Sequence, residues 1–201
     1  MRLPLPALIL TAALAGAVAY PFPARAEIKV RSAVKVYPVR GKTGEDLVDQ
    51  MNKHGPRHGF LTRAIAQTKY SVSWDITWRK SATECRVQQA DATLSIDYTY
   101  PKLDPAADAS LRKRWAQFMK GVRKHEETHG RLAVRMVTEA QKVAEGVSGP
   151  ADAGCRTANG EVRRRVSAIY QRYEAQQLAF DEREHRDGGP VEKLVAALAK
   201  P

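Results

Sequence analysis

The sequence predicts an α+β fold in which a small antiparallel β-sheet of three or four strands packs against a C-terminal antiparallel helical hairpin. Apolar and polar side chains alternate with period two before about residue 105, whereas apolar residues recur every three to four positions after it. The two helical stretches flank a segment rich in glycine and alanine, residues 146–155. With 201 residues, the chain has room for one domain with a core, which we place at residues 27–201.

Residues 1–26 have the pattern of a signal peptide. Arg2 supplies the positive charge, residues 5–18 form an apolar run, and Ala24-Arg25-Ala26 offers a cleavage site between small residues. The apolar run is shorter than the ~20 residues that a membrane-spanning helix needs. We therefore expect a periplasmic or secreted protein that begins at Glu27 and keeps no stable membrane span. An uncleaved membrane anchor is the alternative.

Stretches of strand character are expected within residues 27–104. The first covers Ile28–Val39. In residues 70–78, "YSVSWDITW", aromatic and aliphatic side chains alternate with small polar ones, and residues 92–100, "ATLSIDYTY", repeat the pattern. Alternation of this kind places apolar side chains on one face of a sheet and polar side chains on the other. We therefore expect the tryptophans and tyrosines of these strands to belong to the core.

Helices are expected between the first two strands and throughout the C-terminal half. Thr43 and Asp46 have the spacing of a capping box at the start of a short helix. Residues 105–185 should form the helical hairpin, whose first helix runs from about residue 107 to 145 along one apolar stripe. Residues 186–201 form a tail that includes a short amphipathic helix.

The chain contains two cysteines, Cys85 and Cys155. In an oxidising compartment, they most simply form a disulfide with each other. Their wide separation excludes a zinc site of the Cys-x-x-Cys type. Two unrelated free thiols are the alternative.

The chain is basic, with a formal net charge of +11. Its lysines and arginines are scattered along the predicted helices, and aromatic residues are not interleaved with them as in nucleic-acid-binding modules. We therefore expect no nucleic-acid partner. Attraction to the anionic cell envelope is the interaction that this charge favours.

The motif His-Glu-x-x-His at residues 125–129 carries the main functional signal. On a helix, it places His125 and His129 on one face a single turn apart, which is the separation that two zinc ligands need. Both lie on the apolar stripe, where an unpaired polar group is costly. We therefore predict that both histidines bind zinc (Zn2+) and that Glu126, as general base, takes a proton from the attacking water. A pair of core histidines without metal is the alternative.

A third zinc ligand is expected from the second long helix. If the hairpin turns around residues 147–158, residues 174–185 return to the level of the two histidines. Glu174, Asp181 and His185 are the candidates there. Asp181 and His185 are four positions apart and therefore share a face of the helix.

Several short motifs follow one another in a specific order along the chain. They are Gly55-Pro56, the strand residues Thr68, Tyr70, Val72 and Trp74, Cys85, Tyr100-Pro101, Trp115 with Phe118, and His125, Glu126 and His129. In this order they resemble a bacterial family of secreted zinc-dependent proteases catalogued as domain of unknown function 922. The resemblance implies export, a zincin-like fold and metal site, and peptide hydrolysis.

The same family pattern ends in an aromatic-aspartate pair followed by a histidine and a glycine. Phe180-Asp181 and His185 match it, with His185 one position early. We therefore expect His185 as the third zinc ligand and Asp181 as its alternative. The predicted function is that of an exported zinc metallopeptidase, an enzyme acting on protein or peptide substrates. A non-catalytic envelope protein with a structural or inactive zinc site is the alternative.

Overall fold

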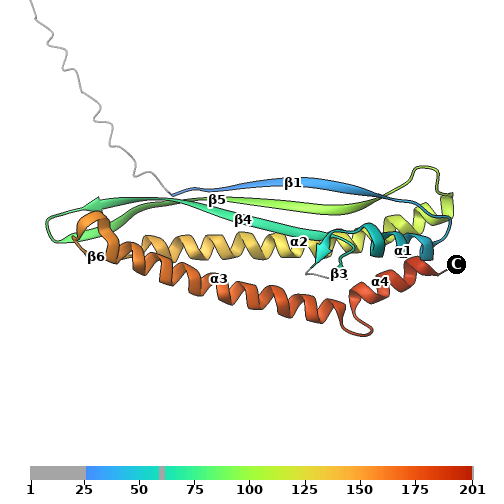
Figure 1. Ribbon diagram of the computed structural model, residues 1–201. Coiled ribbons are helices and arrows are strands. Elements are labelled where there is room, and N and C mark those ends of the chain that lie inside the picture. Colours follow the sequence, from blue (N-terminus) through green and yellow to red (C-terminus); the bar gives the residue numbers. More distant parts are fainter. Residues whose placement is uncertain (1–25, 59–61, 201) are drawn as a thin grey trace, which may run out of the picture.

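The computed structural model describes residues 26–58 and 62–200, and it shows an open, elongated sheet with helices along one of its faces (Figure 1). The elements follow in the order β1 (Ile28–Val39), α1 (Gly44–His54), β2 (Arg57–His58), β3 (Thr62–Arg63), β4 (Gln67–Lys80), β5 (Glu84–Leu103), α2 (Ala109–Glu145), β6 (Ser148–Pro150), a 3-10 turn (Ala153–Cys155), α3 (Arg156–His185) and α4 (Pro190–Ala199). The predicted mixture of strands and helices in one α+β fold is therefore confirmed. Except for Ala26, the predicted signal peptide lies outside the described residues.

The main sheet has four strands, in the order β1-β5-β4 with β6 added beside the start of β5. β4 and β5 form a long antiparallel hairpin, but β1 runs parallel to β5, with Ile28 opposite Ala92 and Val39 opposite Leu103. The expectation of a purely antiparallel sheet is therefore wrong. The chain reverses its direction between β1 and β4, and again between β4 and β5, so β5 runs in the direction of β1.

Two helices, α1 and α2, begin at residues whose side chains cap the first turn. Thr43 and Asp46 form the predicted capping box at the start of α1, with Asp46 N–H donating to the Thr43 hydroxyl over 3.1 Å. The Asp108 carboxylate accepts from the backbone N–H of Leu111, and α2 continues from there for 37 residues, about 55 Å. None of the helices in the described part of the chain is long and apolar enough to cross a bilayer.

The core consists of two clusters that meet opposite halves of α2. One cluster packs β4, β5 and α3 against α2 between Leu132 and Ala144. The other packs β1, α1 and α4 against α2 between Leu111 and Val122. In the interval between the two clusters lie His125 and Glu126, both buried, with 8% and 6% of their surfaces exposed. Burial of ionisable groups at this point of an otherwise apolar core needs a specific reason.

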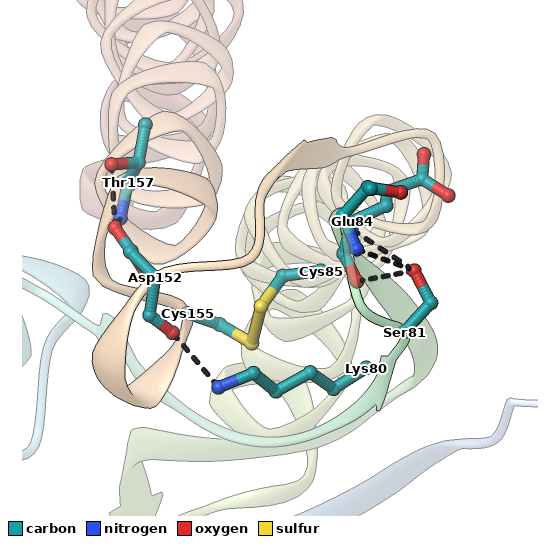
Figure 2. Close-up of a disulfide and its surroundings, with 8 residues drawn as sticks. Lys80, Ser81, Glu84, Cys85, Asp152, Cys155 and Thr157 are labelled. Atoms are coloured by element: carbon teal, nitrogen blue, oxygen red, sulfur yellow. Dashed lines mark hydrogen bonds between the residues drawn. A yellow bond between two sulfur atoms is a disulfide. The ribbon is translucent and has the colours of Figure 1, made fainter.

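A disulfide joins the two layers at the end of the molecule where the helical hairpin turns (Figure 2). Cys85 at the start of β5 is bonded to Cys155, which immediately precedes α3, and their Cα atoms are 5.6 Å apart. The predicted pairing is therefore confirmed. The Lys80 ammonium donates to the backbone oxygen of Asp152 in the same loop, and the Asp152 carboxylate accepts from Thr157. Together these bonds attach the beginning of α3 to the sheet.

Candidate metal centre

The two histidines of the motif lie one turn apart in the middle of α2, facing α3. Because the chain turns between residues 146 and 155, α3 returns antiparallel along α2 (Figure 1). Its last turns therefore come level with His125 and His129, as the spacing in the sequence predicts. This arrangement places Asp181 and His185 beside the two histidines.

Three potential ligand atoms converge between α2 and α3. The Nε2 atoms of His125 and His129 are 3.2 Å apart. Oδ1 of Asp181 lies 2.9 Å from Nε2 of His129 and 3.3 Å from Nε2 of His125. The three atoms thus form a nearly equilateral triangle, with one atom from each side chain.

The dimensions of this triangle fit a zinc ion. With bonds of about 2.0–2.1 Å, two ligand atoms of tetrahedral zinc lie about 3.3 Å apart. The three separations at this site, from 2.9 to 3.3 Å, are close to that value. The donor set of two imidazole nitrogens and a carboxylate oxygen is also one that zinc accepts. The residues present therefore fit the metal that the motif implies.

The orientation of the His129 ring is held by Gln177. Nδ1 of His129 lies 2.5 Å from Oε1 of Gln177, and the Gln177 amide donates to the backbone oxygen of His129 over 3.2 Å. The amide oxygen can only accept, so Nδ1 carries a proton, and Nε2 is the nitrogen left to bond Asp181 or, once deprotonated, to bind a metal. Such partners of a ligating histidine fix its tautomer and raise its affinity for metal.

His185 stands next to the triangle as a fourth potential ligand. Its ring packs edge-on against that of His125, with centroids 5.2 Å apart. Ligand atoms of His125, Asp181 and His185 all lie within 4.8 Å of one another. His185 is thus near enough to complete a tetrahedral site after a small side-chain movement, or to remain beside an open fourth position.

The buried Nδ1 atom of His125 has no hydrogen-bond partner among the described residues. Oε2 of Glu184 is 3.8 Å away, too far for a hydrogen bond but close enough to attract a proton on that nitrogen. The Phe180 ring stacks on His125 at 4.9 Å and meets His129 edge-on at 5.1 Å, so it excludes water from one side of the cluster. Exclusion of water strengthens every electrostatic interaction within the site.

The Glu126 side chain contacts β4 of the sheet. Its Oε2 atom accepts a hydrogen bond from the Thr68 hydroxyl of β4 over 2.6 Å. Burial raises the pKa of the Glu126 carboxyl, and the hydrogen bond from Thr68 and the nearby histidines only partly offset this effect. A carboxylate in this environment binds a proton more readily than an exposed glutamate does.

The electrostatics of the ligand triangle favour a carboxylate between two imidazoles. Burial raises the pKa of Asp181, but hydrogen bonds to His125 and His129 outweigh it and hold that pKa well below its ordinary value. For His129, burial acts to lower the pKa, but the bonds to Asp181 and Gln177 together raise it. Burial and the neighbouring His125 lower the pKa of His185, which keeps it neutral and able to bind metal.

The structure brings together five of the residues singled out in the sequence: His125, Glu126, His129, Asp181 and His185. Glu174, the third candidate ligand, lies instead two helical turns away in a separate pocket. Sequence reasoning missed the roles of Gln177 and Thr68. Gln177 precedes Asp181 by four positions, so the two residues share a face of α3. This spacing is the feature of the sequence that could have predicted a contact between Gln177 and the histidines.

Comparison with known proteins gives a family and no function. The model of a family described as a bacterial protein of unknown function (DUF922) matches residues 34–189, a span that contains the whole candidate site. No curated protein and no solved structure matches the chain. Membership of the family catalogued as domain of unknown function 922 is therefore confirmed, and any activity has to be argued from the site.

Proposed function

This chain belongs to the DUF922 family of bacterial proteins, and on the chemistry of its site we propose that it is an exported zinc-dependent metallopeptidase. The observation that supports this most directly is the triangle of ligand atoms from His125, His129 and Asp181, whose 2.9–3.3 Å edges match those of a zinc tetrahedron. The triangle favours Asp181 over His185 as the third ligand. His185 then borders the fourth position, where a substrate carbonyl or water would bind.

In this proposal, Glu126 is the general base. His125, His129 and Asp181 would hold the zinc, which would supply Lewis acidity to polarise a peptide carbonyl and to activate water near neutral pH. Glu126 follows His125 directly, and Thr68 donates to its Oε2 atom, which leaves Oε1 without a hydrogen bond among the described residues. That oxygen accepts a proton from the attacking water, and the same carboxyl then donates it to the leaving amine. The raised pKa of Glu126 suits both transfers.

The arrangement also supports a zincin-like architecture as part of this proposal. The helix that carries the motif lies beneath an open mixed sheet (Figure 1). The remaining ligand would come from a second helix, α3. Export is supported by the disulfide, because such bonds persist in oxidising compartments. Amino-terminal sequencing of the exported protein should find Glu27 first, and a start at Met1 would contradict export by signal cleavage.

His185 favours a second candidate function, an envelope protein whose zinc is structural. A closed site with four protein ligands holds zinc for stability, whereas a catalytic site leaves one position open. His185 lies within 4.8 Å of both His125 and Asp181, so it is the residue on which the two functions differ.

Zinc content and hydrolysis, measured on the same protein samples, test the proposal. The mature protein should contain one zinc ion by mass spectrometry of the metal, lose it to a chelator, and hydrolyse members of a broad peptide library only when zinc is bound. Glu126→Gln should keep zinc and melting temperature but lose at least about 10²-fold in rate, because an amide cannot accept the proton. His129→Ala should lose both zinc and activity. A Glu126→Gln protein as active as wild type would contradict the mechanism.

A further inference from the structure

A pocket outside the metal centre lies between the sheet and both long helices. It has a volume of about 430 Å³ and is lined by Tyr70, Ser71 and Val72 of β4, Met136 of α2, and Tyr170 and Glu174 of α3. Met136 follows His129 by seven residues, and Glu174 precedes Asp181 by seven. At 1.5 Å per helical residue, the pocket lies about 10 Å along both helices from the ligand triangle.

The tyrosines of the pocket offer aromatic surface in fixed positions. Trp74 donates from its indole nitrogen to the Tyr170 hydroxyl over 2.7 Å, which holds the half-buried Tyr170 in place. Tyr70 of β4 lines the same pocket and keeps 36% of its surface exposed. Val72 and Met136 add an apolar floor that can contact an aliphatic chain. Electron-rich ring faces of this kind attract cations.

Glu174 adds a negative charge at the rim. Its side chain is exposed, and no described lysine or arginine forms an ion pair with it. Arg172, the nearest basic residue along α3, pairs with Glu139 instead. In a chain of net charge +11, a carboxylate left without a cation beside two tyrosines marks a site for a cation from another molecule.

The aromatic, apolar and acidic parts of the pocket together favour one class of ligand side chain. An acidic side chain would be repelled by Glu174, and a short polar one would leave Val72 and Met136 uncovered. Lysine and arginine have an aliphatic stem for the floor and a charged end for the carboxylate and the rings. A lysine or arginine side chain can therefore contact the apolar floor, the two tyrosine rings and the Glu174 carboxylate.

The distance to the metal centre fits an extended peptide. An extended chain advances about 3.3 Å per residue, so about 10 Å corresponds to three residues. β4 passes both places, since Thr68 contacts Glu126 and Tyr70 to Val72 line the pocket. β4 is also the end strand of the order β1-β5-β4, so its outer edge is not paired with another strand of that sheet. A peptide can therefore lie along β4 from the pocket to the metal centre.

We propose that this pocket binds a lysine or arginine side chain of the substrate, about three residues from the bond that is cut. The proposal rests on the proposed peptidase function and names its substrate class: peptides with a basic residue at that distance. Glu174 acts by pairing with the cation and takes no part in the chemistry at the metal.

Binding can be measured without cleavage in zinc-loaded Glu126→Gln protein. The probes are alanine-based octapeptides with one lysine moved from position to position, each matched by a peptide with norleucine there. At one position, lysine should bind about three- to tenfold more tightly than norleucine, the size expected for a partly exposed cation with aromatic and acidic partners. Introducing Glu174→Gln should reduce this preference, because only the ring faces of Tyr70 and Tyr170 then remain as partners of the cation. Glu145→Gln, at an exposed glutamate on α2 far from the pocket, is the control and should keep it.

Two results would overturn the proposed role of this pocket: equal affinity for lysine and norleucine at every position, or a lysine preference that Glu174→Gln leaves unchanged. Absence of measurable binding by any peptide would overturn it as well. The proposed function fails separately, if the wild-type protein hydrolyses no peptide although Glu126→Gln protein shows the Glu174-dependent preference. In that case the pocket stands as a peptide-binding site on a non-catalytic protein.

Discussion

The Nδ1 atom of His129 lies 2.5 Å from the Oε1 atom of Gln177. The uncharged Gln177 amide therefore determines which nitrogen of His129, a candidate zinc ligand, remains available to a metal. Gln177→Leu removes the acceptor, and zinc affinity should fall about 10- to 100-fold. Gln177→Glu keeps an acceptor at the same place and should retain most of the affinity. Competition with a chromogenic chelator measures both.

Gln176→Leu is the matched control for this prediction. Gln176 is the preceding residue on α3 and is exposed, so its replacement should leave zinc affinity unchanged. If Gln177→Leu binds zinc as tightly as this control, the hydrogen bond does not determine the tautomer that binds metal.

Asp181 and His185 should differ in what they do for zinc. Asp181→Asn removes the charged ligand that lies 2.9 Å from His129 Nε2, and zinc binding should be lost. His185→Ala should keep zinc at a ratio of one per chain, because the triangle remains, although affinity can fall modestly. Metal analysis after dialysis against a weak chelator distinguishes the two. Loss of zinc from His185→Ala and its retention by Asp181→Asn would make His185 the third ligand, as the family pattern suggests.

Much of this site follows from local rules in the sequence. The four-residue spacing of His125 and His129 predicts a shared helix face, and an antiparallel hairpin of two long helices must bring residues 174–185 level with them. Both relations hold because helical geometry repeats regularly over many residues. The capping box of Thr43 and Asp46 is predicted for the same reason, since its bonds span only three positions.

Relations between distant elements could not be predicted in this way. The parallel pairing of β1 with β5 depends on which side of the hairpin β1 joins, and its alternating sequence is compatible with either direction. Thr68 reaches Glu126 across 58 positions of sequence. A threonine at the start of a strand has the same local pattern whether or not a glutamate lies opposite. The choice of Asp181 over His185 as the third ligand depends on interatomic distances of a few ångströms. The spacing of residues along the sequence does not give these distances.

Removing the disulfide should destabilise the fold but leave the candidate metal centre intact. The bond closes a loop of 70 residues, for which the chain-entropy model gives about 4 kcal/mol in the free energy of unfolding. We expect Cys85→Ser with Cys155→Ser to lower that free energy by up to this amount in urea denaturation. Zinc content at low temperature should not change, because Cys155 and His185 lie at opposite ends of α3. Peptide mapping without reductant should find the two cysteines linked in the wild-type protein, and free thiols would refute the bond.

Gly130 allows α2 to approach β5 directly beside the candidate metal centre. A Cβ atom at this position would overlap the Tyr98 hydroxyl, while the next ring atom, Cζ, lies 3.1 Å away. The Tyr98 ring cannot easily move, because it stacks on Tyr100 with centroids 6.0 Å apart. Gly130→Ala should therefore destabilise the protein by up to about 2 kcal/mol: overpacking costs about 1–3 kcal/mol, and alanine recovers about 1 kcal/mol in a helix.

Tyr98→Phe removes the overlapping oxygen and should rescue this variant. In the Tyr98→Phe background, Gly130→Ala should cost close to nothing, and the difference between the two backgrounds gives the coupling of the two residues. Gly160→Ala is the control, because a Cβ there meets nothing within 4 Å, and it should stabilise α3 by about 0.4–1 kcal/mol. Gly130 follows His129, so zinc affinity should fall and recover together with stability, measured by urea denaturation and chelator competition. An equal cost of Gly130→Ala in both backgrounds would show that the Tyr98 hydroxyl does not limit the approach of α2 to the sheet.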